Sequence, residues 1–138
     1  AGIPSIALSQ SYAQGDMGPN VPFEAAVQWG ERVLRPLIKE RMDYRTLVNI
    51  NFPAVRANEV KGVRVVSQGI RDYGRLQIVS NYDPRGFEYH WFGLGPMVET
   101  PAHSTDLEAV ADGYVSITPL HLDLTHYDSM DSLKKLYP

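Results

Sequence analysis

Hydrophobic residues fall in short runs and periodic stretches along the first part of the chain. The run from Ile3 to Leu8 ends in polar residues and predicts a buried strand of the kind that a parallel sheet covers on both faces. Apolar positions between residues 23 and 38 recur at the helical period, and Pro36 is expected to kink or end that helix. Thr46 to Phe52 predicts a second strand, stopped by Pro53. Strand, helix and strand together predict an α/β core.

The middle of the chain has a different pattern. Val63 to Val66 and Leu76 to Val79 alternate as strands do, and Asn81 to Gly86 is typical of a tight turn. Aromatic residues then alternate with Glu88 and His90, which predicts a strand with one aromatic face, formed by Phe87, Tyr89 and Trp91. The block predicts an antiparallel hairpin region added to the core.

The last part returns to helix and strand. Thr105 and Glu108 have the spacing of a capping box, and Gly113 is a natural helix stop. Tyr114 to Thr118 predicts a strand, and Asp128 to Tyr137 predicts a short amphipathic helix. A helix of about ten residues is marginal alone in water, so we expect it to dock on the core or on a partner subunit.

These patterns predict four regions. Residues 1–62 and 101–127 are expected to form the core, residues 63–100 a protruding hairpin for oligomerisation, and residues 128–138 a helix that subunits exchange. A strand within three residues of the first position is unusual for a complete domain, since chain ends are usually loose. We therefore expect the chain to begin in the middle of a fold.

Composition narrows the function classes. The 138 residues are 43% hydrophobic, enough for one core, and a net charge of -3 with no long basic run argues against a nucleic-acid polymer as partner. The chain has no cysteine, which excludes disulfides and thiolate metal sites. No apolar run reaches the roughly 20 residues that span a membrane, and no signal-like segment opens the chain. A cytoplasmic protein is the expectation.

Four motifs in order resemble the SurE family (survival protein E). They are Ile3 to Ser9, the strand Leu47 to Pro53, the hairpin Asp83-Pro84-Arg85-Gly86 with Tyr89-His90-Trp91, and a closing signature that runs from Thr105-Asp106 through Gly113 to Leu120 and Asp123-Leu124-Thr125. His90 departs from the tyrosine usual in the family. The resemblance covers nearly the whole chain and implies the second half of a Rossmann-like α/β fold, with a parallel-sheet core, an added hairpin region and a C-terminal helix.

The same resemblance implies an activity. SurE proteins are metal-dependent 5′/3′-nucleotidases, phosphomonoesterases of acid-phosphatase type that release phosphate from nucleoside monophosphates and in some cases act on short polyphosphate. They are linked to stationary-phase survival and form dimers or tetramers that exchange hairpins and C-terminal helices. The resemblance implies Mg²⁺ or Mn²⁺ as the cofactor.

The metal-binding motif of the family has no counterpart in this sequence. The family places a tandem Asp pair near its N-terminus, a downstream Ser and an Asn in a Gly-rich loop, and this chain contains no Asp-Asp pair. No catalytic residue and no metal ligand can therefore be assigned. We expect the chain to be inactive without the metal-binding half.

Three residues are candidates for the substrate pocket. Ser9 lies where a parallel strand is predicted to end, and ligands of α/β sheets bind at that end. Capping of the next turn explains Ser9 about equally well. Thr105 and Asp106 match a family motif, and a capping role at a helix start explains them without a ligand.

His121, Asp123 and His126 form the one cluster that resembles a metal site, to which His103 could add a nitrogen. Their spacing fits no helical ligand signature. The stretch resembles the family's exit from its last strand, where hydrogen bonds that fix the direction of the tail are favoured. A distinct metallohydrolase built on this cluster stays open as an alternative.

The hairpin carries two further candidates. Arginines there could bind an anionic substrate or pair with nearby carboxylates, and they are Arg71, Arg75 and Arg85. Its exposed aromatic face favours contact with a second subunit over base stacking. We expect Arg85, Tyr89, Trp91, Asp123 and His126 to form an oligomer and tail network. The alternative from another class is a non-catalytic binding or oligomerisation module with an α/β core.

Overall fold

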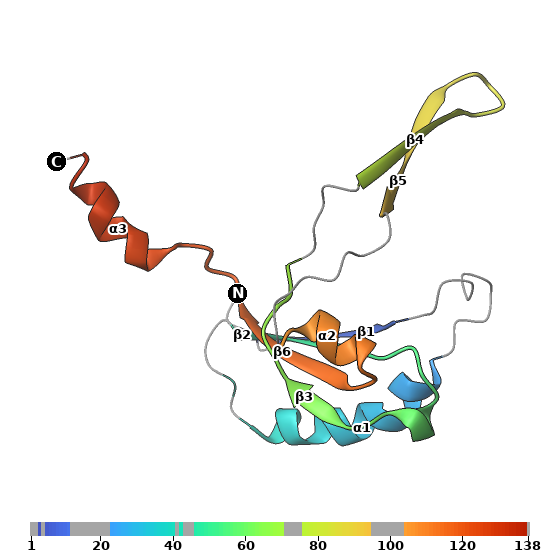
Figure 1. Ribbon diagram of the computed structural model, residues 1–138, viewed down its shortest axis with the longest axis vertical. Coiled ribbons are helices and arrows are strands. Elements are labelled where there is room, and N and C mark those ends of the chain that lie inside the picture. The colour runs from blue at the N-terminus through green and yellow to red at the C-terminus, as the bar shows by residue number, and fades with distance from the viewer. Residues whose placement is uncertain are drawn as a thin grey trace.

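The computed structural model shows a small α/β core with two arms (Figure 1). It describes residues 3, 5–11, 23–40, 42, 46–70, 76–94 and 104–137. The helices and strands are β1 (Ser5–Gln10), α1 (Glu24–Lys39), β2 (Thr46–Phe52), the 3₁₀ turn η1 (Ala57–Glu59), β3 (Val63–Val65), β4 (Leu76–Tyr82), β5 (Glu88–Leu94), α2 (Asp106–Ala111), β6 (Val115–His121) and α3 (Tyr127–Lys134).

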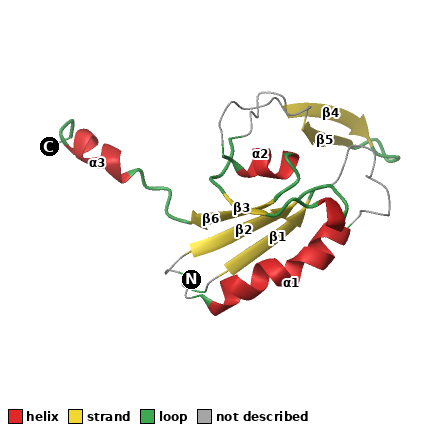
Figure 2. Ribbon diagram, turned by 60° about the horizontal axis from the view of Figure 1, so that its bottom comes forward, coloured by secondary structure: helices red, strands yellow, loops and turns green. Residues whose placement is uncertain are grey.

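Four strands form the main sheet in the order β1-β2-β6-β3. β1 runs parallel to β2, β6 runs antiparallel to β2, and β3 runs parallel to β6. Helix α1 lies on one face of this sheet and α2 on the other (Figure 2). The α/β fold is confirmed, but its sheet is mixed, because β6 returns antiparallel to the strand that precedes it in the sheet.

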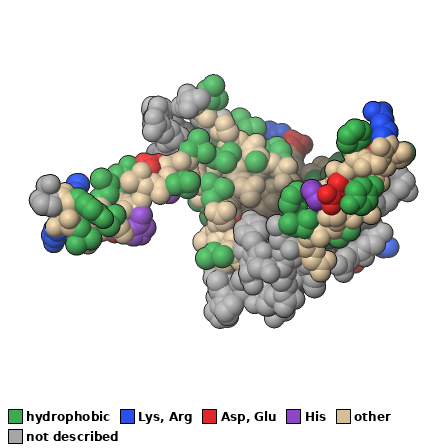
Figure 3. Space-filling model, turned by 90° about the horizontal axis from the view of Figure 1, so that it is seen from above, with side chains coloured by type: hydrophobic (Ala, Val, Ile, Leu, Met, Phe, Trp, Pro, Cys, Tyr) green, Lys and Arg blue, Asp and Glu red, His purple; other side chains and the backbone are tan. Residues whose placement is uncertain are grey.

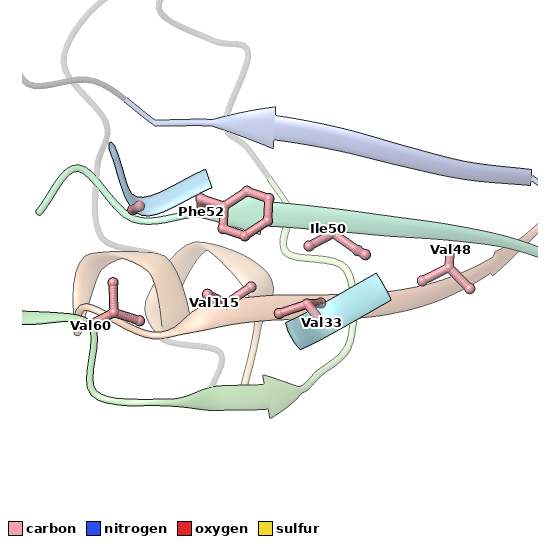
Figure 4. Close-up of a cluster of buried hydrophobic side chains, with 7 residues drawn as sticks. Val33, Val48, Ile50, Phe52, Val60 and Val115 are labelled. Carbon is pink, nitrogen blue, oxygen red and sulfur yellow. The ribbon is translucent and has the colours of Figure 1, made fainter. Parts of the chain in front are cut away.

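The hydrophobic core lies between the sheet and α1. Val48, Ile50 and Phe52 alternate along β2 and are at most 5% exposed, so one face of the strand is fully covered. Val33 of α1 and Val115 of the neighbouring strand β6 belong to the same buried cluster (Figure 4). The two-residue period of β2 therefore divides its side chains between this core and the opposite face.

Helix α1 continues through Pro36 to Lys39, so Pro36 does not end the helix near Arg35, one of its two expected effects. Pro36 stands in the last turn, where the loss of one amide donor disturbs little of the helix, and the N–H of Glu40 still bonds to the Pro36 carbonyl at 3.2 Å. The indole of Trp29 donates to the Ala57 carbonyl at 2.9 Å and ties α1 to η1.

β1 differs from the buried strand that its apolar sequence predicts. Four of its six residues are exposed, including Leu8 at 50%. Among the strands that the structure describes, β1 pairs only with β2, so its outer edge is open. A groove of about 700 Å³ runs beside it, lined mainly by apolar side chains of β1, α1 and Phe52. An edge position exposes a sequence that would suit the middle of a sheet.

β3 also differs from expectation. Val63 to Val66 was expected to belong to the hairpin region, but β3 pairs with β6 in the main sheet. Backbone hydrogen bonds to β6 hold the short strand there. One of them runs from the N–H of Val115, the first residue of β6, to the Gly62 carbonyl at 2.9 Å. The hairpin itself begins at Leu76.

The hairpin of β4 and β5 forms the first arm, clear of the sheet in Figure 1. Its predicted turn is confirmed. The Asp83 carboxylate accepts from the N–H groups of Arg85 and Phe87 at 2.8 and 2.9 Å, and Gly86 takes a φ of 86°. Tyr89 and Trp91 meet edge to face at 6.4 Å on the predicted aromatic side.

Helix α3 forms the second arm and buries none of its residues. Its hydrophobic side chains are exposed, as are those of the hairpin (Figure 3); on α3 they are Tyr127, Met130 and Leu133. Of the two expected docking sites, the core of its own chain is therefore not used, and docking on a partner subunit stays a prediction. No helix among the described residues is both long and apolar enough to cross a membrane.

Candidate functional site: a polar cavity beside the second helix

A cavity of about 970 Å³ opens on the face of the sheet that α1 does not cover. It lies between the carboxyl ends of β1 and β2, the segment after β3, and helix α2. Its described lining residues are Ser9, Gln10, Ser11, Asn49, Asn51, Ala54, Val55, Gln68, Gly69, Ile70, Asp106, Leu107, Val110 and Ala111. Ligands of open α/β sheets bind at this end of parallel strands.

The floor of the cavity is polar because polar and apolar side chains alternate along β2. Asn49 and Asn51 occupy the pleat positions between the core residues, so their amides lie on the face opposite α1. Ser9 of β1 and Ser116 of β6 stand in register with Asn51, and the Asn51 amide donates to the Ser116 hydroxyl at 3.3 Å. A row of uncharged polar groups therefore crosses three strands.

Thr118 adds a buried hydroxyl to the same face. It stands in register with Asn49, is 2% exposed, and its Oγ1 has no hydrogen-bond partner in the part of the chain that the structure describes. Buried polar atoms are usually paired, so an unpaired hydroxyl is unusual on a sheet face that serves packing alone.

Asp106 forms the wall opposite the sheet. One oxygen of its carboxylate, Oδ1, accepts from the N–H of Gly69 at 2.7 Å and from the N–H of Leu107 at 2.9 Å. A Cβ at Gly69 would come within 2.8 Å of the Leu107 side chain, so a larger residue there would have to displace Leu107. The carboxylate is thus fixed by backbone groups from two segments.

Gln10 joins the elements that surround the cavity. Its Nε2 donates to the carbonyls of Ser11 and Pro53, each at 2.8 Å, and its Oε1 accepts from the N–H of Ala26 at 3.1 Å. One side chain therefore holds the end of β1, the end of β2 and the start of α1 together. Its amide is used within the protein, so Gln10 positions the cavity.

The structure brings two of the three predicted pocket residues together. Ser9 and Asp106 line the same cavity. Thr105 is 4% exposed and caps α2: its hydroxyl accepts from the N–H of Glu108 at 3.4 Å, which confirms its capping role. Asn49 and Asn51 were missed by sequence reasoning. Their regular alternation with the apolar residues of β2 was the signal that could have found them.

The predicted oligomer and tail network is not joined within one chain. Arg85, Tyr89 and Trp91 lie on the hairpin, while Asp123 and His126 lie at the start of the second arm (Figure 1). His126 Nδ1 and the Ser129 hydroxyl are 2.7 Å apart. Arg71, Arg75 and His103 lie outside the described residues. Contact between hairpin and tail stays a prediction about an assembly of several chains.

Asp123 organises the segment that leads into α3. Its Oδ1 accepts from the N–H of Thr125 at 2.9 Å and its Oδ2 from the Tyr127 hydroxyl at 2.6 Å. Hydrogen bonds from Thr125 and Tyr127, with a smaller contribution from the charge of His121, lower the pKa of Asp123 from 3.8 to about 2. The carboxylate raises the pKa of Tyr127 in turn.

A titration of Asp123 checks this network. Because its folded-state pKa is depressed, the contribution of Asp123 to stability is present above pH 3.8 and is lost as the pH falls toward 2. We expect its carboxyl carbon resonance to titrate near 2 in the intact chain and at a higher pH in a Tyr127→Phe variant. A midpoint that Tyr127→Phe leaves unchanged would contradict the assigned hydrogen bond.

A metal site among these residues is not supported. The described part of the chain holds no group of three or more His, Asp, Glu or Cys side chains that could bind a metal ion. Both Asp123 oxygens already accept hydrogen bonds within the tail. His121, Asp123 and His126 thus show no arrangement of metal ligands in the part of the chain that the structure describes.

Sequence comparison decides the family. Residues 1–75 match the family described as "Survival protein SurE". The chain belongs to the SurE family. It is 55% identical over 137 residues to a protein of Rhizorhabdus wittichii named "5′-nucleotidase SurE", a match that covers 99% of this chain and 54% of that protein. A protein of the same name from Erythrobacter litoralis is 50% identical over 126 residues, covering 91% of this chain and 49% of the relative.

A solved structure agrees with this SurE assignment. The SurE protein from Aquifex aeolicus superposes with a TM-score of 0.72 at 36% identity, over 99% of this chain and 53% of that one. The chain thus spans about half the length of the relatives that it matches. The predicted family and fold are confirmed.

Proposed function

We propose that this SurE chain supplies the substrate-binding cavity of a divalent-metal-dependent 5′/3′-nucleotidase. The observation that carries the proposal is the cavity at the carboxyl ends of β1 and β2, in a chain whose relatives are named 5′-nucleotidases. The proposed substrates are nucleoside monophosphates, with short polyphosphate as a second class, and the proposed metal is Mg²⁺ or Mn²⁺.

The described lining residues bind and orient rather than activate water. Hydrolysis of a phosphomonoester breaks the bond between phosphorus and the ester oxygen, with water as the nucleophile, and needs a base or a metal to activate that water. Asp106 is the only ionisable side chain among the described lining residues, and two backbone N–H groups hold one of its oxygens. The activating groups of the proposed enzyme must come from residues other than these.

A chimaera tests the proposed activity. This chain replaces the matched part of the Rhizorhabdus wittichii relative, so that the unmatched part of that relative completes the protein. We expect phosphate release from AMP within about tenfold of the relative's own rate, because the exchanged part is 55% identical. EDTA should abolish the activity and Mn²⁺ should restore it.

The 138-residue chain by itself should release no phosphate under the same conditions. A chimaera that folds, as judged by circular dichroism and gel filtration, but does not hydrolyse AMP would refute the proposed function. Metal-dependent hydrolysis by the pure 138-residue chain would instead show that the activating groups lie within it.

The exposed apolar arms favour a second role in assembly. Phe92 on the hairpin and Leu133 on α3 are 68% and 54% exposed, and side chains of this kind gather at subunit interfaces. We propose a homodimer or homotetramer that joins through both arms. Light scattering after gel filtration is expected to give a multiple of 15.5 kDa, and a monomer at micromolar concentration would contradict this proposal.

A further inference from the structure

The cavity beside α2 has the chemistry of a site for an uncharged, partly apolar ligand. Its amide and hydroxyl groups lie on the side of the sheet, where Ser9, Asn49 and Asn51 line it. Apart from Asp106, its opposite side is apolar, built mainly from Leu107, Val110 and Ile70. No Lys or Arg is among the described lining residues, and the one charge there is the Asp106 carboxylate.

Two polar groups of the cavity are held in place and still have an acceptor free of the described residues. Asp106 uses Oδ1 for two backbone N–H groups, and Oδ2 accepts from no described residue. Asn51 donates through Nδ2 to Ser116, which orients its amide and leaves Oδ1 as an acceptor. The described cavity therefore offers fixed acceptors to a ligand that carries hydroxyl donors.

These acceptors suit sugar hydroxyls and not a phosphate group. A phosphate dianion beside the Asp106 carboxylate would be repelled, whereas a hydroxyl donates to a carboxylate in a strong, charge-assisted bond. The apolar wall gives a flat base a surface to cover. A volume of about 970 Å³ is in the range of small-molecule sites.

We propose that this cavity binds the nucleoside part of the substrate, with the sugar hydroxyls on Asp106 and Asn51 and the base against the wall formed by Leu107 and Val110. The phosphate then lies outside the cavity. This inference rests on the proposed nucleotidase function and adds to it the part of the substrate that this chain recognises. Asp106 is a specificity-determining residue in this arrangement.

Binding to the 138-residue chain tests the assignment. Adenosine, AMP, 2′,3′-dideoxyadenosine and inorganic phosphate are each titrated by calorimetry at one ionic strength. We expect adenosine and AMP to bind within about threefold of each other, and dideoxyadenosine at least about tenfold more weakly, because it lacks the hydroxyls that bond to a charged acceptor. Inorganic phosphate should not displace adenosine.

An Asp106→Asn variant tests whether Asp106 causes the preference for adenosine over dideoxyadenosine. The amide oxygen can still accept from Gly69 and Leu107, so the local backbone is kept while the free acceptor becomes a donor. We expect about tenfold weaker binding of adenosine and less than about twofold change for dideoxyadenosine. Asp112→Asn is the matched control, because Asp112 pairs with Arg64 at 2.9 Å and does not line the cavity.

Several results would overturn the inference. They are binding of AMP without adenosine, displacement by phosphate, equal binding of dideoxyadenosine, an unchanged affinity in Asp106→Asn, or no binding of any nucleoside. If the chimaera hydrolyses AMP while the chain fails this test, the inference falls and the proposed function stands. If the chain binds adenosine as expected and the folded chimaera is inactive, the nucleotidase function falls instead.

Discussion

Replacement of Phe52 by alanine is expected to lower the free energy of unfolding by about 3–5 kcal/mol. Phe52 is 1% exposed and is among the largest fully buried side chains of the chain. It ends β2 between the sheet and α1, where Ile50 and Val33 belong to the same cluster. Removal of the ring leaves a cavity that a close-packed core cannot refill, so the loss includes a cavity term beyond the transfer of the ring to water.

Phe87→Ala is the matched control for this prediction. Phe87 is 69% exposed in the turn of the hairpin, and its removal should change stability by no more than about 0.5 kcal/mol. Urea unfolding followed by circular dichroism measures both variants, with the midpoint compared at constant slope. Equal losses in the two variants would mean that the core described here is not what stabilises the chain.

Replacement of Gln10 by methionine is expected to cost about 2–3 kcal/mol, because the apolar side chain leaves polar groups of three segments without their partner. The N–H of Ala26 and the carbonyl of Pro53 lose bonds of 3.1 and 2.8 Å. Methionine fills a similar volume, so the change removes hydrogen bonds with little change in packing. We also expect weaker adenosine binding, since Gln10 holds the two strand ends that border the cavity.

Gln28→Met is the control for Gln10→Met. Gln28 lies exposed on α1, and its side-chain amide bonds to the side chain of Glu24 at 3.4 Å and to no other residue that the structure describes. Its replacement should alter stability by less than about 0.5 kcal/mol, because surface changes of this kind leave no buried group unpaired. Urea midpoints and adenosine titrations of both variants test the prediction. A loss in Gln28→Met as large as in Gln10→Met would remove the basis for a special role of Gln10.

Local signals in the sequence predicted several elements correctly. Thr105, Glu108 and Gly113 mark the bounds of α2 because caps and glycine stops act within a few residues of backbone. The alternation along β2 and the turn at Asp83 have the same local character. Each depends on the conformational preference of one short segment, which survives in almost any tertiary context.

Pairing partners were not predictable in this way. β3 joins β6 in the main sheet, although its sequence was equally consistent with the neighbouring hairpin. β1 has the composition of a covered strand and lies at an open edge among the described strands. Exposure depends on which other segments reach a strand, and that information is not carried by the strand itself.

The candidate site also combines residues that the sequence indicates with residues that only the fold brings together. Ser9 and Asp106 could be proposed from the end of a strand and from a family motif, 97 positions apart, but their meeting on one cavity depends on how α2 folds back over the sheet. The alternation along β2 places Asn49 and Asn51 on one face, but that they line a cavity together with Gln68 follows only from the sheet face that α1 leaves free. Long-range contacts of this kind are set by packing of the whole core, which no local pattern encodes.

The sequence by itself determined the SurE family, the α/β class and the bounds of most helices and strands, because these follow from short-range preferences and from motifs in a fixed order. Only the tertiary structure decided that the sheet is mixed and that the polar residues of β2 share a cavity with Asp106. Those features depend on side chains distant in the sequence, which are brought together when the apolar face of β2 packs on α1.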